Sequence, residues 1–220
     1  LSYKFLVSLS RKESIEDILR NNGLVDFSMF KSSSKELKEK NSLVSIENAL
    51  DRYYYTRLMQ FSKILPKEGA LFRDFLLKEV EILNILTLFR LKKAKFDKGI
   101  IKDFIIPVGD KAKDLKMIDL ASIEDLEQLS KALIKTEYKN LIVKGIEEFK
   151  KSNSLINLEI EFYKYLLRQS VLFMHQHPLS IDVILGYMFA KDIEVRNLKI
   201  IVKGKQLNLG EQFIESQLVF

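Results

Sequence analysis

The order of apolar and polar residues along the chain is typical of amphipathic helices. In KEVEILNILTLF, residues 78–89, apolar residues recur every three or four positions, as they do on one face of an α-helix. Alternating, strand-like patterns are rare, and the best strand candidate, KDFIIPVG from Lys102, is short. Only 3 prolines and 8 glycines interrupt the chain, which favours long helices joined by short turns. The sequence therefore predicts an all-α fold.

The predicted helices are spread over most of the chain. Their expected ranges are residues 14–21, 44–64, 69–96, 99–106, 122–135, 138–150, 154–174, 179–204 and 208–218. The helix that starts near Pro178 carries Ser180 and Asp182 in its first turn. Polar and acidic side chains there bind free backbone N–H groups and complement the helix dipole.

Two of the long helical patterns repeat each other. Adding 113 to each residue number takes Glu81 to Glu194 and Asn84 to Asn197 without a gap. We call this alignment the repeat register. Its other polar pairs are Lys78 and Lys191, Glu79 and Asp192, and Lys92 and Lys205. Its apolar pairs are Leu71 and Ile184, Phe72 and Leu185, Phe75 and Met188, Leu76 and Phe189, Val80 and Ile193, Ile82 and Val195, Ile85 and Leu198, and Phe89 and Val202. The register continues, because IIKDFII from Ile100 lies over FIESQLV from Phe213.

Upstream of these helices the alignment drifts by a few residues. SIED at 14–17 returns at 122–125, and ELKEKNS from Glu36 resembles EFKKSNS from Glu148. We match Ile46, Leu50, Tyr53 and Tyr55 with Ile156, Ile160, Tyr163 and Tyr165. The chain is therefore predicted to be two tandem helical repeats, residues 1–110 and 111–220, joined within PVGDKAKDLKMIDLAS. Arrays of helical repeats commonly present binding surfaces.

Composition narrows the class of protein. There is no cysteine, which excludes disulfides, thiolate metal ligands and a cysteine nucleophile. The apolar runs are far shorter than the roughly 18 residues of a membrane-spanning helix, and LSYKFLVSLSRKES at the start is a poor signal peptide. We expect no transmembrane segment and a cytosol-facing chain. A first residue of leucine suggests that the numbering begins inside a longer gene product or that the chain has been trimmed.

Charge gives little sign of a nucleic-acid partner. The net charge of +6 comes from 36 basic and 30 acidic residues, which are mixed along nearly every segment, as on solvated helix faces. Nucleic-acid binders gather their basic residues into a stripe or a recognisable motif, and we find neither here. We therefore expect no nucleic acid among the partners.

Candidate chemistry is sparse. No glycine-rich phosphate loop of the GxxxxGK[ST] or GxGxxG type occurs, so the chain is not expected to hydrolyse ATP. His175 and His177 form H-x-H, but no clustered carboxylate completes a metal site. The simpler interpretation is that this pair ends one helix and packs against the turn into Pro178. We expect no cofactor, no metal and no catalytic residue.

The polar pairs Glu81 with Asn84, and Glu194 with Asn197, are the most informative candidates. Residues three apart lie on nearly the same helix face, and here they have apolar neighbours. A polar group buried without a partner costs about 1–3 kcal/mol. Three interpretations remain open: a solvated edge, an internal hydrogen bond that fixes how two helices cross, or contact with a partner protein.

The end of the chain carries a family resemblance. HPLSIDVILGYMFAKDIEVRNLKIIVKGKQLNLGEQFIESQLVF resembles the C-terminal end of the C subunit of archaeal and bacterial V/A-type ATPases, the counterpart of the d subunit of the eukaryotic vacuolar enzyme. The residues that carry it are His177, Pro178, Leu179, Tyr187, Lys191, Glu194, Asn197 and Leu198. ENALDRYYYTRL and EVEILNILTLFRLKKAKF look like the same segments of another family repeat.

This resemblance implies a funnel-shaped, all-helical protein without a catalytic site. In the family, the subunit lies on the cytoplasmic end of the membrane rotor ring of proteolipid subunits. The central-stalk subunits of the soluble head insert into it, so that it transmits torque for proton or sodium transport. The family commonly has three helical repeats, whereas two are found here. The alternatives are a free-standing helical scaffold for soluble partners and an uncharacterised helical enzyme.

Overall fold

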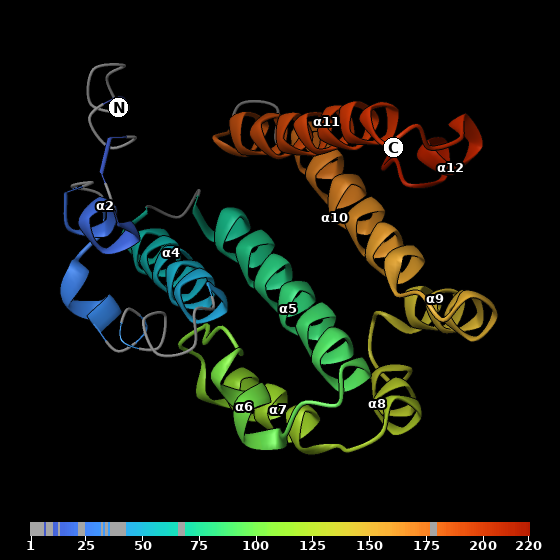
Figure 1. Cartoon of the computed structure of the whole chain (residues 1–220), viewed down its shortest axis with the longest axis horizontal. Helices are drawn as coiled ribbons and strands as arrows, with labels where there is room; N and C mark the ends of the chain where they lie inside the picture. Colours follow the sequence, from blue (N-terminus) through green and yellow to red (C-terminus); the bar gives the residue numbers. More distant parts are fainter. Residues whose placement is uncertain are drawn as a thin grey trace. The chain divides into compact units, whose positions relative to one another are not determined.

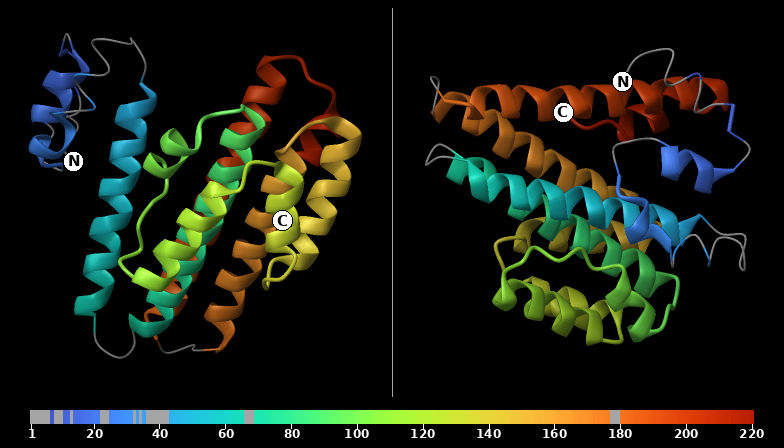
Figure 2. Two further views of the ribbon diagram at one scale, coloured as in Figure 1. Left: turned by 90° about the horizontal axis from the view of Figure 1, so that it is seen from below. Right: turned by 90° about the vertical axis from the view of Figure 1, so that its left-hand side faces the viewer.

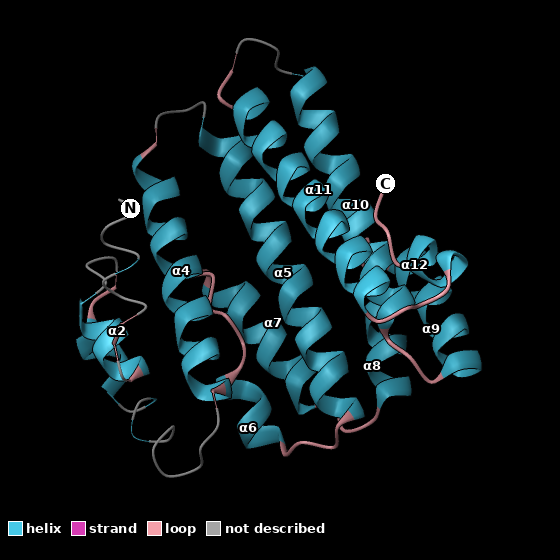
Figure 3. Cartoon of the chain, turned by 45° about the horizontal axis from the view of Figure 1, so that its top comes forward, coloured by secondary structure: helices cyan, strands magenta, loops and turns pink. Residues whose placement is uncertain are grey.

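A computed structural model describes residues 7, 11–12, 14–21, 25–31, 33, 35, 43–65, 69–176 and 180–220. Every regular element in these residues is a helix, which confirms the predicted all-α fold (Figure 3). In chain order the elements are α2 (Ile15–Asn21), the 3₁₀ turn η1 (Phe27–Phe30), α4 (Val44–Ile64), α5 (Gly69–Lys93), α6 (Lys98–Asp103), α7 (Lys111–Ser122), α8 (Leu126–Leu133), α9 (Lys139–Ser152), α10 (Ile156–Gln176), α11 (Asp182–Gln206) and α12 (Glu211–Ser216).

By its contacts the chain forms two compact units, residues 1–58 and 59–220. The first unit has a small apolar core of Leu19, Phe30 and Ile46. The rings of Phe30 and Tyr53 pack at a tilt, with centroids 5.7 Å apart. This core joins the short N-terminal helical segments to α4.

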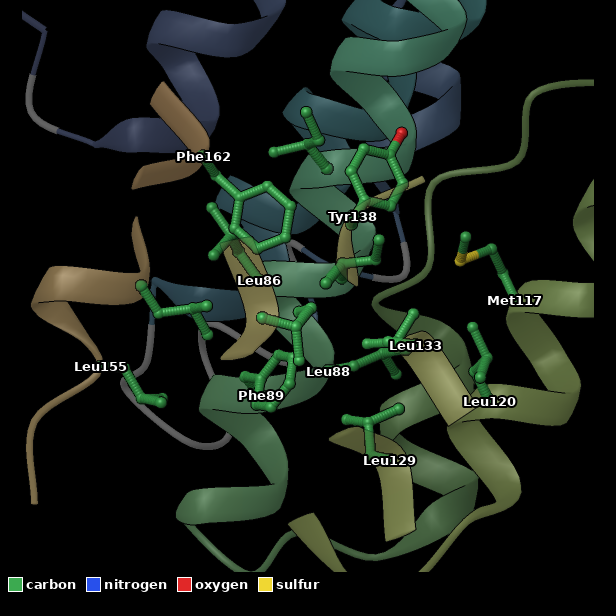
Figure 4. Packing of buried hydrophobic residues seen from close by; sticks show 14 of the residues in the cluster. Leu86, Leu88, Phe89, Met117, Leu120, Leu129, Leu133, Tyr138, Leu155 and Phe162 are labelled. Atoms are coloured by element: carbon green, nitrogen blue, oxygen red, sulfur yellow. The ribbon is translucent and has the colours of Figure 1, made fainter. Parts of the chain in front are cut away.

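The second unit is built around α5. Apolar residues point from this helix in all directions, which is typical of a helix buried in a core. Figure 4 shows side chains of α5, α7, α8 and α10 converging in this core. Those labelled are Leu86, Leu88, Phe89, Met117, Leu120, Leu129, Leu133, Tyr138, Leu155 and Phe162. Within the same unit, α9 and α11 both pack along α10 (Figure 1), so α10 links the core to α11.

Helix α7 was not predicted, and this is a correction. Residues 111–122 were interpreted as part of a junction because Pro107 and Gly109 precede them. The structure makes them helical, with Met117 and Leu120 buried against α5. Asp114 holds the start of this helix, because its carboxylate accepts hydrogen bonds from the backbone N–H of Val108 and Gly109 (2.8 and 3.2 Å). Burial against α5 thus stabilises a helix that the sequence pattern of residues 111–122 did not predict.

Several predicted helix ends also move. The helix expected at 122–135 begins only at Leu126. Of the SIED segment, Ser122 is the last residue of α7, and residues 123–125 connect α7 to α8. The helix expected to reach residue 96 ends at Lys93, because Lys95 adopts a left-handed backbone (φ 58°). Asn208, its counterpart in the repeat register, does the same (φ 53°) and follows the end of α11. The turn at each helix end therefore stops the helix.

Helix lengths recur between the two halves of the chain. α5 and α11 are both 25 residues long, and α6 and α12 are both 6 residues long. In both pairs, the first residues of the two helices match each other in the repeat register, and so do the last residues. The repeat found in the sequence therefore also appears in the structure, because the matched helices begin and end at matched residues.

The helices upstream of these pairs keep a slightly different alignment. α4 and α10 are both 21 residues long, beginning at Val44 and Ile156. Aligning these first residues places buried Ile46 on buried Leu158, whereas Ile156 is 43% exposed. The burial pattern thus favours Leu158 as the counterpart of Ile46, in place of the match with Ile156 expected from the sequence.

The long helices carry charged residues among their apolar ones, which makes insertion into a bilayer unfavourable. In the described part of the chain, no helix combines the length and the apolar character that crossing a bilayer requires. Figure 2 shows the same helices from two further directions.

Candidate functional site

The two asparagines each bind a backbone segment behind a short helix. The Asn84 Nδ2 donates to the Ile106 carbonyl and its Oδ1 accepts from the Ile106 N–H, both at 2.9 Å. Asn197 makes the same two bonds to Val219, at 2.7 and 3.0 Å. An amide is suited to this role because it offers one donor and one acceptor side by side. Each asparagine therefore closes the chain that follows α6 or α12 back onto its long helix.

These bonds decide between the interpretations of the asparagines. Each asparagine makes internal hydrogen bonds, as the second of the three interpretations expected. The partner, however, is a non-helical segment and not a second long helix. Ile106 and Val219 are buried and lie outside any helix, so their backbone groups need a partner. Asn84 is itself fully enclosed, whereas Asn197 is half-buried.

Glu81 and Lys78 tie α5 to the turn before α9. The Tyr138 hydroxyl donates to a carboxylate oxygen of Glu81 at 3.2 Å, and Lys116 Nζ lies 3.9 Å from the other oxygen. Burial, and then the negative charge of Glu81, raises the pKa of the Tyr138 hydroxyl far above its usual value. Lys78 Nζ lies 3.3 Å from Glu137. Sequence reasoning missed Tyr138, because its bond partner is 57 residues away.

The counterparts of these residues on α11 behave differently. Lys191 and Glu194 pair with each other along the same exposed helix face. The Lys191 ammonium also lies 5.8 Å from the ring centroid of Tyr187, an exposed residue. The hydrogen bond to Glu194 raises the pKa of Lys191. None of these bonds leaves α11, so this polar edge is open to solvent.

The histidine candidates add no chemistry to the site. His177, Pro178 and Leu179 lie outside the described residues. His175 is exposed near the end of α10. Among the residues that the structure describes, no group of three or more His, Asp or Glu side chains could hold a metal ion. The expectation that the chain uses no metal and no cofactor stays a prediction.

A groove that the sequence did not indicate lies between α10, α11 and α12. Its volume is about 310 Å³, at the low end for ligand pockets. The lining is mostly apolar, and residues from all three helices contribute: Ile156, Ile160, Ile200, Leu207, Phe213 and Ile214. The Arg196 guanidinium stacks 3.7 Å over the ring of Tyr163, and its buried Nε has no hydrogen-bond partner. No local pattern predicts such a groove, because three separate elements form it.

Comparison with known proteins decides the family. The model of the ATP synthase (C/AC39) subunit family matches residues 1–217. The chain belongs to this family. The C subunit of the A-type ATP synthase of Methanococcoides burtonii is 36% identical over 100% of this chain and 60% of its own length. The C subunits of the A-type ATP synthases of Methanosarcina acetivorans and Methanocaldococcus jannaschii are 34% and 27% identical, covering 99% and 97% of this chain and 58% and 54% of theirs.

Membership of the C/AC39 family confirms the resemblance based on the C-terminal segment. The chain spans about 60% of the length of these relatives. No solved structure matches the chain. The family therefore rests on sequence, and the described fold adds the positions of its residues.

Proposed function

We propose that this chain is a non-catalytic subunit of a V/A-type rotary ATPase that couples the central stalk to the membrane rotor ring. The family match over residues 1–217 carries this proposal. The partners would be the proteolipid subunits of the ring and the stalk subunits of the soluble head. The complex would use or make ATP while it transports protons or sodium. The chain would lie peripherally on the cytoplasmic face of the membrane.

The packing of the second unit supports a mechanical role. A protein that transmits torque must resist deformation, and close-packed interiors have low compressibility. α5 is enclosed by α7, α8, α9 and α10, and the asparagine bonds hold the segments behind α6 and α12. Force applied at one helix would therefore reach its neighbours with little local yielding.

We also propose that residues 1–110 and 111–220 are two copies of one helical repeat. The equal lengths of α5 and α11, and of α6 and α12, and their shared repeat register support this division. The two asparagine bonds recur in the same register. In this proposal His177, Pro178, Tyr187, Lys191 and Glu194 are candidate partner contacts, while Glu81, Asn84 and Asn197 are structural.

Recovery from membranes tests the function. A tagged copy of the whole chain is expressed in cells that make the other subunits, and membranes are solubilised in mild detergent. We expect rotor-ring and stalk subunits to co-purify with the folded bait. Replacing Tyr187 and Lys191 together by alanine should lower this recovery, whereas Gln128→Ala, at an exposed site on α8, should not. The proposal is contradicted if a folded bait recovers no part of the ATPase, and soluble partners alone would favour a free-standing scaffold.

A further inference from the structure

The groove between α10, α11 and α12 (Figure 1) is lined by a guanidinium that no acidic group neutralises. This is Arg196 of α11, whose Cζ lies 3.7 Å from the ring centroid of Tyr163. Stacking on an aromatic ring orients a guanidinium while its N–H groups stay available. Among the residues that the structure describes, none pairs with Arg196 or accepts a hydrogen bond from its buried Nε. The side chain is therefore held in place with its donors unused.

Arg90 shows how the same chain binds a guanidinium to an anion. Its Nε and one of its Nη atoms bind the two carboxylate oxygens of Glu159, at 2.8 and 2.6 Å. Guanidinium and carboxylate prefer such a fork of two parallel bonds because both groups are planar. Glu159 also lines the groove, but Arg90 already binds both of its oxygens. Glu159 is therefore not the anion that Arg196 lacks.

A second cation lines the same groove. Lys203 lies about two turns further along α11, and its ammonium pairs with no carboxylate of the described part of the chain. Glu159 is the only acidic residue in the lining. Since Arg90 neutralises it, the charges of Arg196 and Lys203 stay unmatched, and the groove selects an anion.

The rest of the lining is mostly apolar. Ile160 and Ile214 are buried there, whereas Leu207 and Phe213 are 66% and 52% exposed. Apolar side chains beside unpaired cations suit a ligand that has an apolar body and an anionic end, because each part meets its complement. The volume of about 310 Å³ is at the low end for ligand pockets. A single hydrocarbon chain therefore fits this groove better than a pair of chains.

We propose that the groove binds a long-chain carboxylate, with its head group on Arg196 and its hydrocarbon chain along the apolar wall. The carboxylate binds Arg196 as Glu159 binds Arg90, and Lys203 adds a second positive charge. The apolar lining selects a chain of methylene groups over a small polar anion. The proposal concerns this groove alone and is independent of the coupling role proposed above.

Isothermal titration calorimetry of the whole chain tests the proposal, with dodecanoate below its micelle concentration as the probe. We expect one binding site per chain. Butyrate has the same head group and a shorter chain, and dodecyltrimethylammonium has the same chain and a positive head group. Each should bind at least about tenfold more weakly than dodecanoate, because each lacks one of the two complementary parts.

Substitutions locate the site. Arg196→Gln removes the charge and should weaken dodecanoate binding at least about tenfold. Arg196→Lys keeps the charge without the fork and should restore part of the affinity. Lys203→Gln should weaken binding about threefold. The matched controls, Arg168→Gln on α10 and Lys199→Gln on α11, are at exposed sites outside the groove and should change nothing.

Several results would overturn the proposal. One is a folded parent chain that does not bind dodecanoate, or that binds dodecyltrimethylammonium equally well. Another is affinity that survives Arg196→Gln in a chain whose circular dichroism and melting temperature match the parent, or that Arg168→Gln lowers equally. If Arg196→Gln does not fold, Phe213→Asp at an exposed position of the groove replaces it; it should weaken binding at least about tenfold, and unchanged affinity contradicts the site. Tighter binding of dodecyl phosphate would assign the groove to a phosphate head group instead of a carboxylate.

Discussion

At the scale of single residues, equivalent side chains differ in how much water can reach them. Asn84 and Asn197 make the same pair of backbone hydrogen bonds, but Asn84 is buried and Asn197 is half-buried. A hydrogen bond that water can replace contributes less to stability than one that leaves buried groups unsatisfied when it is lost. The two asparagines are therefore expected to differ in energetic weight.

Substitution of the asparagines measures this difference. Asn84→Leu leaves both backbone groups of Ile106 without a partner and should lower the free energy of unfolding by about 3 kcal/mol. Asn197→Leu should cost about 1 kcal/mol, because water can reach its site. Urea denaturation gives both values, and Asn140→Leu, at an exposed site of α9, serves as the control. Equal losses at Asn84 and Asn197 would contradict the assignment.

At the scale of helices, the close crossing of α9 and α10 depends on a glycine, and the sequence alone does not predict this. Gly145 of α9 faces α10, and a Cβ built there would lie 2.2 Å from Leu158 Cδ1 and 3.0 Å from its Cα. Backbone cannot move aside as a flexible side chain can, so the two helices approach closely only because Gly145 has no side chain. Gly99 of α6 is different, since no atom lies within 4 Å of a Cβ built there.

The glycine pair makes a direct test of this crossing. Alanine is the better helix former by about 1 kcal/mol, so Gly99→Ala should raise stability slightly. Gly145→Ala should instead lower it by about 1–3 kcal/mol, because overpacking outweighs propensity. Thermal unfolding of both variants checks the sign. A stabilising Gly145→Ala would show that α9 and α10 are free to move apart.

The helices also show how much of the fold the sequence pattern predicts. α4, α5, α10 and α11 were predicted to within a few residues because each is a long stretch rich in apolar residues that no proline interrupts. α7 was missed because it is held by burial of Met117 and Leu120 and by the Asp114 carboxylate. Of the site, the polar pairs were found through the repeat, but Tyr138 and the groove beside Arg196 were not, because their neighbours are distant in sequence.

At the scale of the whole molecule, several buried or paired groups hold their protons more tightly in the folded chain. Burial is the largest cause of the raised pKa of Tyr138 and of Tyr165. For Lys78, burial opposes the shift, but the bonds to Tyr165 and Glu137 raise the pKa overall. Lys92 acts in the opposite direction, because burial lowers its pKa.

The stability of the folded chain should therefore fall in alkaline solution. In the unfolded chain Tyr138 loses its proton near pH 10, whereas in the folded chain it keeps it. Its contribution is fully present below pH 10 and declines above it by about 1.4 kcal/mol per pH unit. Urea denaturation between pH 8 and 11 measures this slope, and Tyr138→Phe should make it shallower. An equal slope in that variant would assign the decline to other groups.

The sequence by itself determined the all-α class, the long helices, the recurrence of residues in the repeat register and the family, because these follow from local periodicity and from residue identity at matched positions. Only the tertiary structure decided that Asn84 and Asn197 bind the chain behind short helices and that residues 111–122 fold as a helix. It alone decided that α10, α11 and α12 enclose a groove beside Arg196. Periodicity shows that a face is apolar; what lies against it depends on segments far away in the chain.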